Sequence, residues 1–199
     1  MTASTSVPGR GEQPARAITN LLKPVHVLLA GLTGIGLAAG GSWAGALWGL
    51  FAALCAGLLP AGYIDWEKRR GRWGDRHVVD RASRRPIFLV ILGSIGFAAA
   101  VMVLAGAPGD VLRAMVALWV MTVGLLVVND AGKWKISVDC AVASSVVTML
   151  TVVAGPWWSA AYCLTLLVCW TRVHLGYHTT AQTAAGTALG MATTLLWLV

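Results

Sequence analysis

The sequence predicts an all-α protein, a polytopic transmembrane bundle of six or seven helices. Hydrophobic residues make up 57% of the 199-residue chain and charged residues only 12%, whereas soluble domains carry about 25% charged residues. The mean hydropathy is +0.73. Several apolar stretches also reach about 17–25 residues, the length that a helix needs to cross a bilayer. We therefore expect lipid to cover much of the apolar surface.

Each apolar stretch is predicted as a helix, because a backbone in hydrocarbon must satisfy its own hydrogen bonds. Some of these stretches are short, and Pro60 interrupts the second, so the number of spans stays open between six and seven. The predicted spans are residues 25–42, 43–64, 87–106, 110–128, 138–154, 156–172 and 180–198.

The N-terminal segment differs from the rest in composition. Residues 1–22 are rich in Ser, Thr, Gly and Pro and contain Arg10 and Arg16. We interpret them as a disordered cytosolic tail, with residues 23–199 forming the membrane domain.

Cysteine spacing gives no sign of a metal site or a redox motif. The chain has neither a CxxC pair nor a zinc-type spacing. All the cysteines lie in or at the ends of apolar runs, and we interpret them as packing residues. They are Cys55, Cys140, Cys163 and Cys169.

Basic residues lie in the tail and in alternate loops. If seven helices cross the membrane, Arg113 alone lies on the opposite side, and the positive-inside rule makes the basic side cytosolic. We therefore expect an integral, multi-pass protein of the cell membrane whose polar loops face the cytosol. The cluster from Lys68 to Arg72 also suits anionic lipid headgroups. Membrane lipid is the expected partner, and nucleic acid is not; the sequence predicts no oligomeric state.

Three polar segments should emerge on the same face of the membrane, because two predicted spans separate each from the next. The segments are residues 65–86, 129–139 and 171–182. Their charged and imidazole side chains are thus expected to converge at the level of the lipid headgroups.

Each segment carries groups that suit a phosphate ligand. Arg81 and Arg85 are four residues apart and share a face if helical, and guanidinium groups match phosphate oxygens. Ser137 lies at a predicted helix start, where backbone N–H groups bind anions. In the third segment Arg172 precedes His178 by six residues, which places a fixed cation near an imidazole.

In this order the segments resemble the three signatures of the type 2 phosphatidic acid phosphatase superfamily, over roughly residues 43–198. The matching residues are Arg81, Arg85 and Pro86, then Ser137, then Arg172 and His178.

The resemblance implies a role for each matching residue. His178 is expected to attack phosphorus and become transiently phosphorylated, with no metal cofactor. Gln182 stands where most relatives carry an aspartate that orients this histidine, as it does in dolichyl-diphosphate phosphatases. The predicted phosphate-binding residues are Arg172, Arg81, Arg85, Ser137, Lys133 and Lys135.

Two positions depart from the family pattern. Val78 occupies the place of a lysine in the first signature, and Asp139 that of the histidine that protonates the leaving group. Such acid catalysis contributes about 10²–10⁴-fold, and a monoester needs it because the alkoxide that it releases is strongly basic, with a conjugate acid whose pKa lies far above neutral pH. A diphosphate instead releases a phosphate monoester whose second pKa is about 6. Asp139 therefore favours diphosphate substrates, unless it inactivates the enzyme.

A different chemistry also fits these residues. Carboxylates beside diphosphate oxygens suit Mg²⁺, and aromatic faces stabilise carbocations, so an Mg²⁺-dependent membrane terpene cyclase is an alternative. An aromatic belt at the membrane interface also explains the ten tryptophans. No metal site is identified. The candidate accessory residues are His77, His174, Asp75, Asp80 and Asp130.

The sequence thus predicts a membrane enzyme that releases phosphate from a lipid-borne prenyl or polyprenyl diphosphate. The other hypotheses are the terpene cyclase and a lipid-phosphate-binding protein with impaired catalysis.

Overall fold

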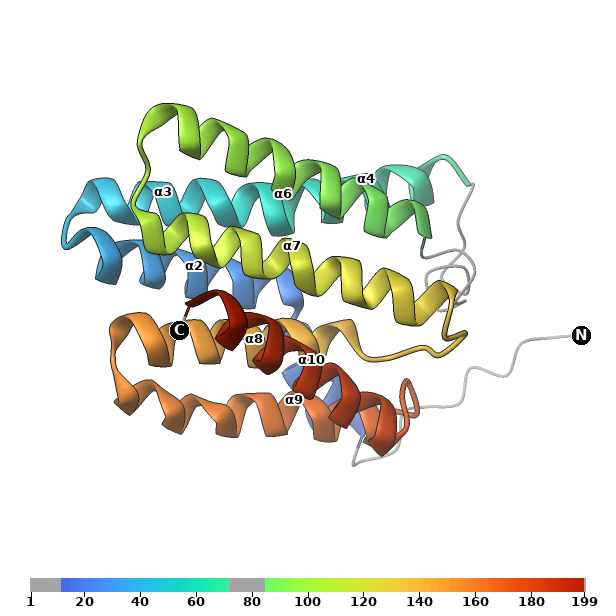
Figure 1. The fold of residues 1–199 in the computed structure, drawn as a ribbon. Helices are drawn as coiled ribbons and strands as arrows, with labels where there is room; N and C mark the ends of the chain where they lie inside the picture. Colours follow the sequence, from blue (N-terminus) through green and yellow to red (C-terminus); the bar gives the residue numbers. More distant parts are fainter. Residues whose placement is uncertain (1–11, 72–84, 199) are drawn as a thin grey trace, which may run out of the picture.

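The computed structural model describes residues 12–71 and 85–198, and every regular element in these ranges is helical. The predicted all-α class is therefore confirmed for this part of the chain. In chain order the helices are α1 (Glu12–Leu21), α2 (Pro24–Gly40), α3 (Trp43–Ala53), α4 (Leu59–Arg69), α6 (Arg85–Ala105), α7 (Gly109–Asp130), α8 (Val138–Ala154), α9 (Tyr162–His174) and α10 (Thr180–Leu198) (Figure 1).

The structure corrects part of the prediction that the N-terminal segment is disordered, because it contains helix α1. Residues 12–21, expected to be disordered, form an amphipathic helix in which Ala15 is fully buried. The helix packs on α9 and meets α2 at a bend of 43°. One apolar face supported by a neighbouring helix is sufficient to order a short segment of otherwise polar composition.

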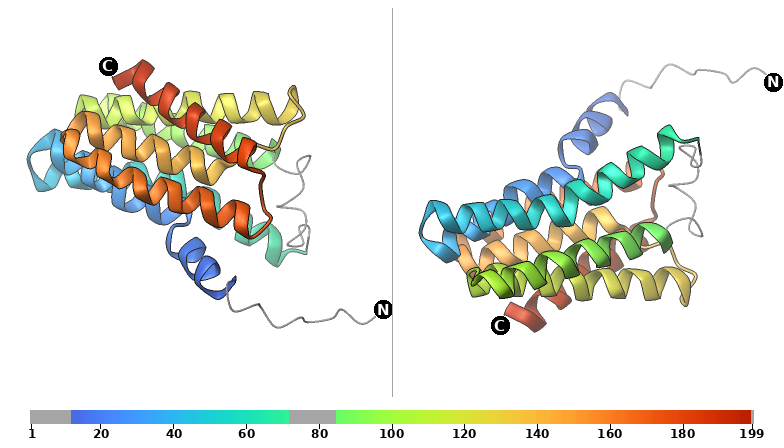
Figure 2. Two further views of the ribbon diagram at one scale, coloured as in Figure 1. Left: turned by 90° about the horizontal axis from the view of Figure 1, so that it is seen from below. Right: turned by 90° about the horizontal axis from the view of Figure 1, so that it is seen from above.

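Helix α8 lies at the centre of the bundle. Every residue from Cys140 to Leu150 is buried, and α8 contacts α2, α7, α9 and α10 (Figures 1 and 2). Small side chains allow this close packing, and the hydroxyl groups among them bond across helices. Ser145 Oγ, for example, lies 2.8 Å from Thr194 Oγ1 of α10.

Helices α2 and α3 form a tight hairpin whose contact face is glycine. A Cβ atom at Gly36 would meet the carbonyl oxygen of Gly45, and one at Gly49 would meet that of Leu32. Gly41 ends α2 with a positive φ of 55°, a conformation that glycine adopts without strain. The two backbones therefore touch directly.

Helix α3 continues into α4 through a π-helical segment, Leu54–Leu58, so one rod extends from Trp43 to Arg69. The expected interruption at Pro60 is accommodated there. Proline cannot donate to the carbonyl of residue 56 and its ring crowds that oxygen. The wider π turn that contains Ala56 relieves the crowding.

The number of membrane spans is supported only in part. By length and composition, Trp43–Arg69, Arg85–Ala105 and Gly109–Asp130 could each cross a bilayer, and the bent α1–α2 pair would be a fourth span. Helix α8 is apolar but has only 17 residues. The count of six or seven spans stays a prediction.

The polar segments meet at one end of the bundle. The α7–α8 and α9–α10 connections and the first residues of α6 lie there, whereas the turns after α2, α6 and α8 lie at the opposite end (Figures 1 and 2). Residues 129–139 and 171–182 therefore lie at the same end of the bundle, while the membrane face to which this end belongs stays a prediction.

Replacing Gly49 with alanine should destabilise the bundle, because the new Cβ would collide with the Leu32 carbonyl. Overpacking of this kind costs about 1–3 kcal/mol. The measurement is thermal unfolding in detergent micelles. Gly62→Ala is the matched control, since a Cβ at Gly62 meets nothing within 4 Å. Equal melting temperatures for the two variants would contradict the glycine contact.

Candidate active site

The central feature of the polar end is an ion pair between α9 and α8. Arg172, in the last turn of α9, places Nη2 3.0 Å from Oδ1 of Asp139, in the first turn of α8. The two side chains are only 12% and 19% exposed. Arg172 Nε is also buried and has no hydrogen-bond partner among the described residues. The guanidinium therefore retains capacity for a further acceptor.

His178 is 9% exposed and its orientation is fixed by Gln182. The Nδ1 atom of His178 lies 3.2 Å from Gln182 Oε1, and the same oxygen lies 3.1 Å from the backbone nitrogen of Thr179. A backbone N–H can only donate, so the amide atom that faces it must be the oxygen. His178 Nδ1 therefore carries the proton and donates it to Oε1. In the neutral imidazole this tautomer carries its lone pair on Nε2, the arrangement that a nucleophilic histidine requires.

Gln182 has a structural role as well. Thr179 Oγ1 accepts a hydrogen bond from the Gln182 backbone nitrogen at 3.3 Å, while Gln182 bonds back to Thr179. This reciprocal arrangement is a capping box at the start of α10. Thr179 was not among the predicted site residues, although the Thr-x-x-Gln spacing is readable in the sequence.

Two contacts join the second predicted segment to the third. The Ser137 backbone nitrogen donates to the Gln182 carbonyl at 3.1 Å, and Lys135 Nζ lies 3.4 Å from the Tyr177 carbonyl oxygen. Arg172 also accepts backbone hydrogen bonds from Tyr177 and His178 at 3.0 and 3.2 Å. The imidazole and the ion pair consequently belong to one connected unit.

Ser137 serves the helix more directly than a ligand. It is fully buried, and its Oγ accepts the Cys140 backbone N–H at 3.3 Å as the N-cap of α8. A hydroxyl placed in this way stabilises the helix start. The structure therefore favours a capping role over the expected phosphate contact.

Other predicted residues lie at the edge of the site or outside it. Arg85 pairs with Asp130 at 3.6 Å; the Arg85 side chain is exposed and the Asp130 side chain is partly exposed. His174 stacks on Trp170 with 5.0 Å between ring centroids. Lys133 is exposed with a positive φ of 48°. The remaining candidates, Asp75, His77, Asp80 and Arg81, lie outside the described residues.

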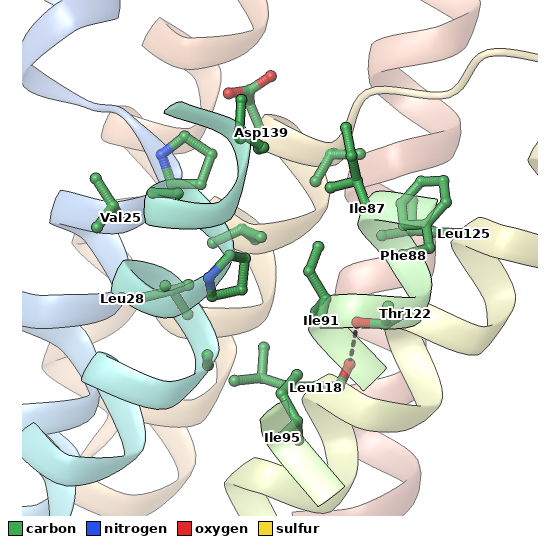
Figure 3. Close-up of a pocket in the computed structure, with 18 of the residues that line it drawn as sticks. Val25, Leu28, Ile87, Phe88, Ile91, Ile95, Leu118, Thr122, Leu125 and Asp139 are labelled. Carbon is green, nitrogen blue, oxygen red and sulfur yellow. Dashed lines mark hydrogen bonds between the residues drawn. The ribbon is translucent and has the colours of Figure 1, made fainter. Parts of the chain in front are cut away.

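An apolar cavity of about 340 Å³ opens beside the ion pair, within the range of about 300–1,000 Å³ typical of small-molecule sites. Its walls come from α2, the π-helical segment, α4, α6, α7 and α8. Figure 3 shows Asp139 at one end and Ile95 near the other. From Ile87 to Ile95 the cavity follows α6 over eight residues, or about 12 Å.

Comparisons with protein-family models, curated proteins and solved structures gave no match. The functional interpretation consequently rests on the residues and the geometry described above.

Asp139→Asn should strengthen anion binding, because the charge of Arg172 would no longer be neutralised. We expect inorganic pyrophosphate to bind about tenfold more tightly, equivalent to about 1.4 kcal/mol, in calorimetric titration of the purified protein. Asp110→Asn is the matched control. Asp110 also forms an ion pair, with 3.0 Å between its Oδ1 and Arg113 Nη1, but this pair lies outside the site. An unchanged affinity in the Asp139 variant would mean that Arg172 does not face the ligand.

Proposed function

We propose that the chain is an integral membrane enzyme that releases phosphate from a lipid-borne prenyl or polyprenyl diphosphate. One observation carries the proposal: a continuous series of contacts leads from the apolar cavity to His178. Asp139 lines the cavity and forms an ion pair with Arg172, and the Arg172 carbonyl accepts a hydrogen bond from the backbone nitrogen of His178. A lipid with an anionic headgroup needs an apolar binding site that ends at a cation and a nucleophile. This lipid is the proposed partner, and the loops that carry the site are proposed to face the cytosol.

In the proposed reaction His178 Nε2 attacks the terminal phosphorus. The N–P bond forms as the bridging P–O bond breaks, and the prenyl monophosphate departs with the bonding electrons. Water then hydrolyses the phosphohistidine to inorganic phosphate. Arg172 leaves Asp139 to bind the non-bridging oxygens, where charge develops in the transition state. Gln182 holds the imidazole through Nδ1.

Asp139 explains why a diphosphate is preferred. A carboxylate paired with a guanidinium at 3.0 Å accepts hydrogen bonds and has no proton to give. An alkoxide leaving group would therefore depart without help, whereas a phosphate monoester, with a second pKa of about 6, leaves readily.

The shape of the cavity supports a prenyl chain as the apolar part of the substrate. Branched side chains such as Ile91 and Leu125 line it, together with Gly57 in the π-helical segment. Its extent of about 12 Å along α6 is less than half of the roughly 30 Å hydrocarbon core. It therefore suits the first isoprene units of a chain rather than a whole polyprenyl tail.

The terpene cyclase remains the second hypothesis, but the cavity gives it little support. Among the residues that line the cavity, Phe88 is the aromatic one, and no described tryptophan does so. Most described tryptophans are instead well exposed, as a belt at the membrane interface would be.

The proposal is tested with purified protein and farnesyl or geranylgeranyl diphosphate, with and without EDTA. We expect EDTA-resistant release of inorganic phosphate and prenyl monophosphate. His178→Asn should lower the rate by on the order of 10³-fold or more, as removal of a nucleophile does. Release of pyrophosphate with a cyclic hydrocarbon that EDTA abolishes would instead establish the cyclase. Binding without turnover would establish a lipid-phosphate-binding protein.

Filling the cavity should impair the use of lipid substrates selectively. Ile91→Trp should lower kcat/KM for geranylgeranyl diphosphate, because misfits in apolar pockets cost about 10–200-fold. Calorimetric binding of inorganic pyrophosphate should not change. Leu89→Trp is the control: Leu89 is on the same helix but 53% exposed, so the indole should face lipid. Equal kinetics for the two variants would show that the prenyl chain binds elsewhere.

A further inference from the structure

Two cysteines lie in contact next to the Asp139–Arg172 ion pair. The Sγ atoms of Cys140 in α8 and Cys169 in α9 are 3.2 Å apart. Cys140 is fully buried, whereas Cys169 is partly exposed. Spacing in the sequence gives no indication of this pair, because 29 residues separate the two positions.

The position of this dithiol relates it to the candidate active site. Cys140 directly follows Asp139, and Cys169 precedes Arg172 by three residues, which places them on one face of α9. Cys169 Sγ also lies 3.4 Å from Thr187 Oγ1 of α10. The thiols consequently contact or adjoin all three helices that carry the ion pair and the Gln182 cap.

We propose that Cys140 and Cys169 form a modification site, at which a hydroperoxide oxidises the dithiol reversibly to a disulfide bond between α8 and α9. The more exposed Cys169 sulfur attacks the terminal oxygen of the hydroperoxide and the O–O bond breaks, which leaves a sulfenic acid and releases an alcohol, or water when the oxidant is hydrogen peroxide. The Cys140 sulfur then attacks the sulfenic sulfur, releases water and forms the S–S bond. One hydroperoxide supplies both oxidising equivalents, and a thiol reductant reverses the reaction.

Disulfide formation should change the geometry of the adjacent candidate active site. An S–S bond is about 2.05 Å long, so the sulfur atoms must approach by roughly 1 Å. The shift moves Cys140, the neighbour of Asp139 in the chain, and Cys169, which lies about one helical turn from Arg172. Misplacement of catalytic groups by about 1 Å can cost on the order of 10²-fold in rate. This effect on turnover rests on the proposed function, whereas the disulfide itself does not.

The test is peptide mapping of the full chain in detergent micelles. Protein treated with stoichiometric hydrogen peroxide is alkylated, digested without reductant and analysed by mass spectrometry. We expect a linked peptide pair containing Cys140 and Cys169 that dithiothreitol separates. Cys163→Ser is the matched control on the same helix, since Cys163 is exposed, and should form the same link. Modification of Cys163 while Cys140 remains fully alkylated would overturn the proposal.

Coupling to the site is read separately. Oxidised protein should lose about tenfold or more of its farnesyl diphosphate turnover and recover it with dithiothreitol, and Cys169→Ser should resist the loss. A linked pair with unchanged turnover would refute the coupling. If the reduced protein does not turn over prenyl diphosphate, the proposed function fails, and the mapping result still decides the modification site.

Discussion

The ion pair between Arg172 and Asp139 is the interaction on which the polar end of the bundle depends. Each charge alone would be costly at its level of burial, and each stabilises the other. The helix dipoles add to this. Asp139 occupies the positive N-terminal turn of α8, and Arg172 the negative C-terminal turn of α9. The two charges of the pair therefore neutralise each other without a ligand, and an incoming anion must compete with a carboxylate for the guanidinium.

The central position of α8 gives this competition a rigid frame. A Cβ at Gly186 of α10 would meet the Ser137 carbonyl, and one at Gly190 would meet that of Ala141. The backbones of α8 and α10 thus touch at the level of the site. Since the Gln182 side chain holds His178 from the first turn of α10, this backbone packing sets the position of that turn relative to Asp139.

Composition and the length of the apolar runs predicted the helical class, and the even number of predicted spans between residues 129–139 and 171–182 predicted that these segments lie at the same end of the bundle. The bond between His178 and Gln182 is local, and the resemblance of residues 171–182 to the third phosphatase signature suggested it. The Asp139–Arg172 and Cys140–Cys169 contacts were not predicted, because they depend on how α8 and α9 are rotated about their axes. Ser137 shows the same limit: a serine before a helix suits a cap and an anion site equally, and only its burial favours the cap.

The π-helical segment has a consequence for the space beside the ion pair. Five residues, Leu54–Leu58, form a turn wider than an α-turn, and its Ala56 and Gly57 face the cavity. The extra residue in this turn rotates the helix that follows, α4, by about 100° around its axis relative to regular α-helical winding. Loss of one residue there would restore regular winding and point a different stripe of α4 inward, in place of Pro60, Ala61 and Ile64. The volume of the cavity therefore depends on the winding of this segment, and the loss of one residue would remove that volume without altering the polarity of the chain.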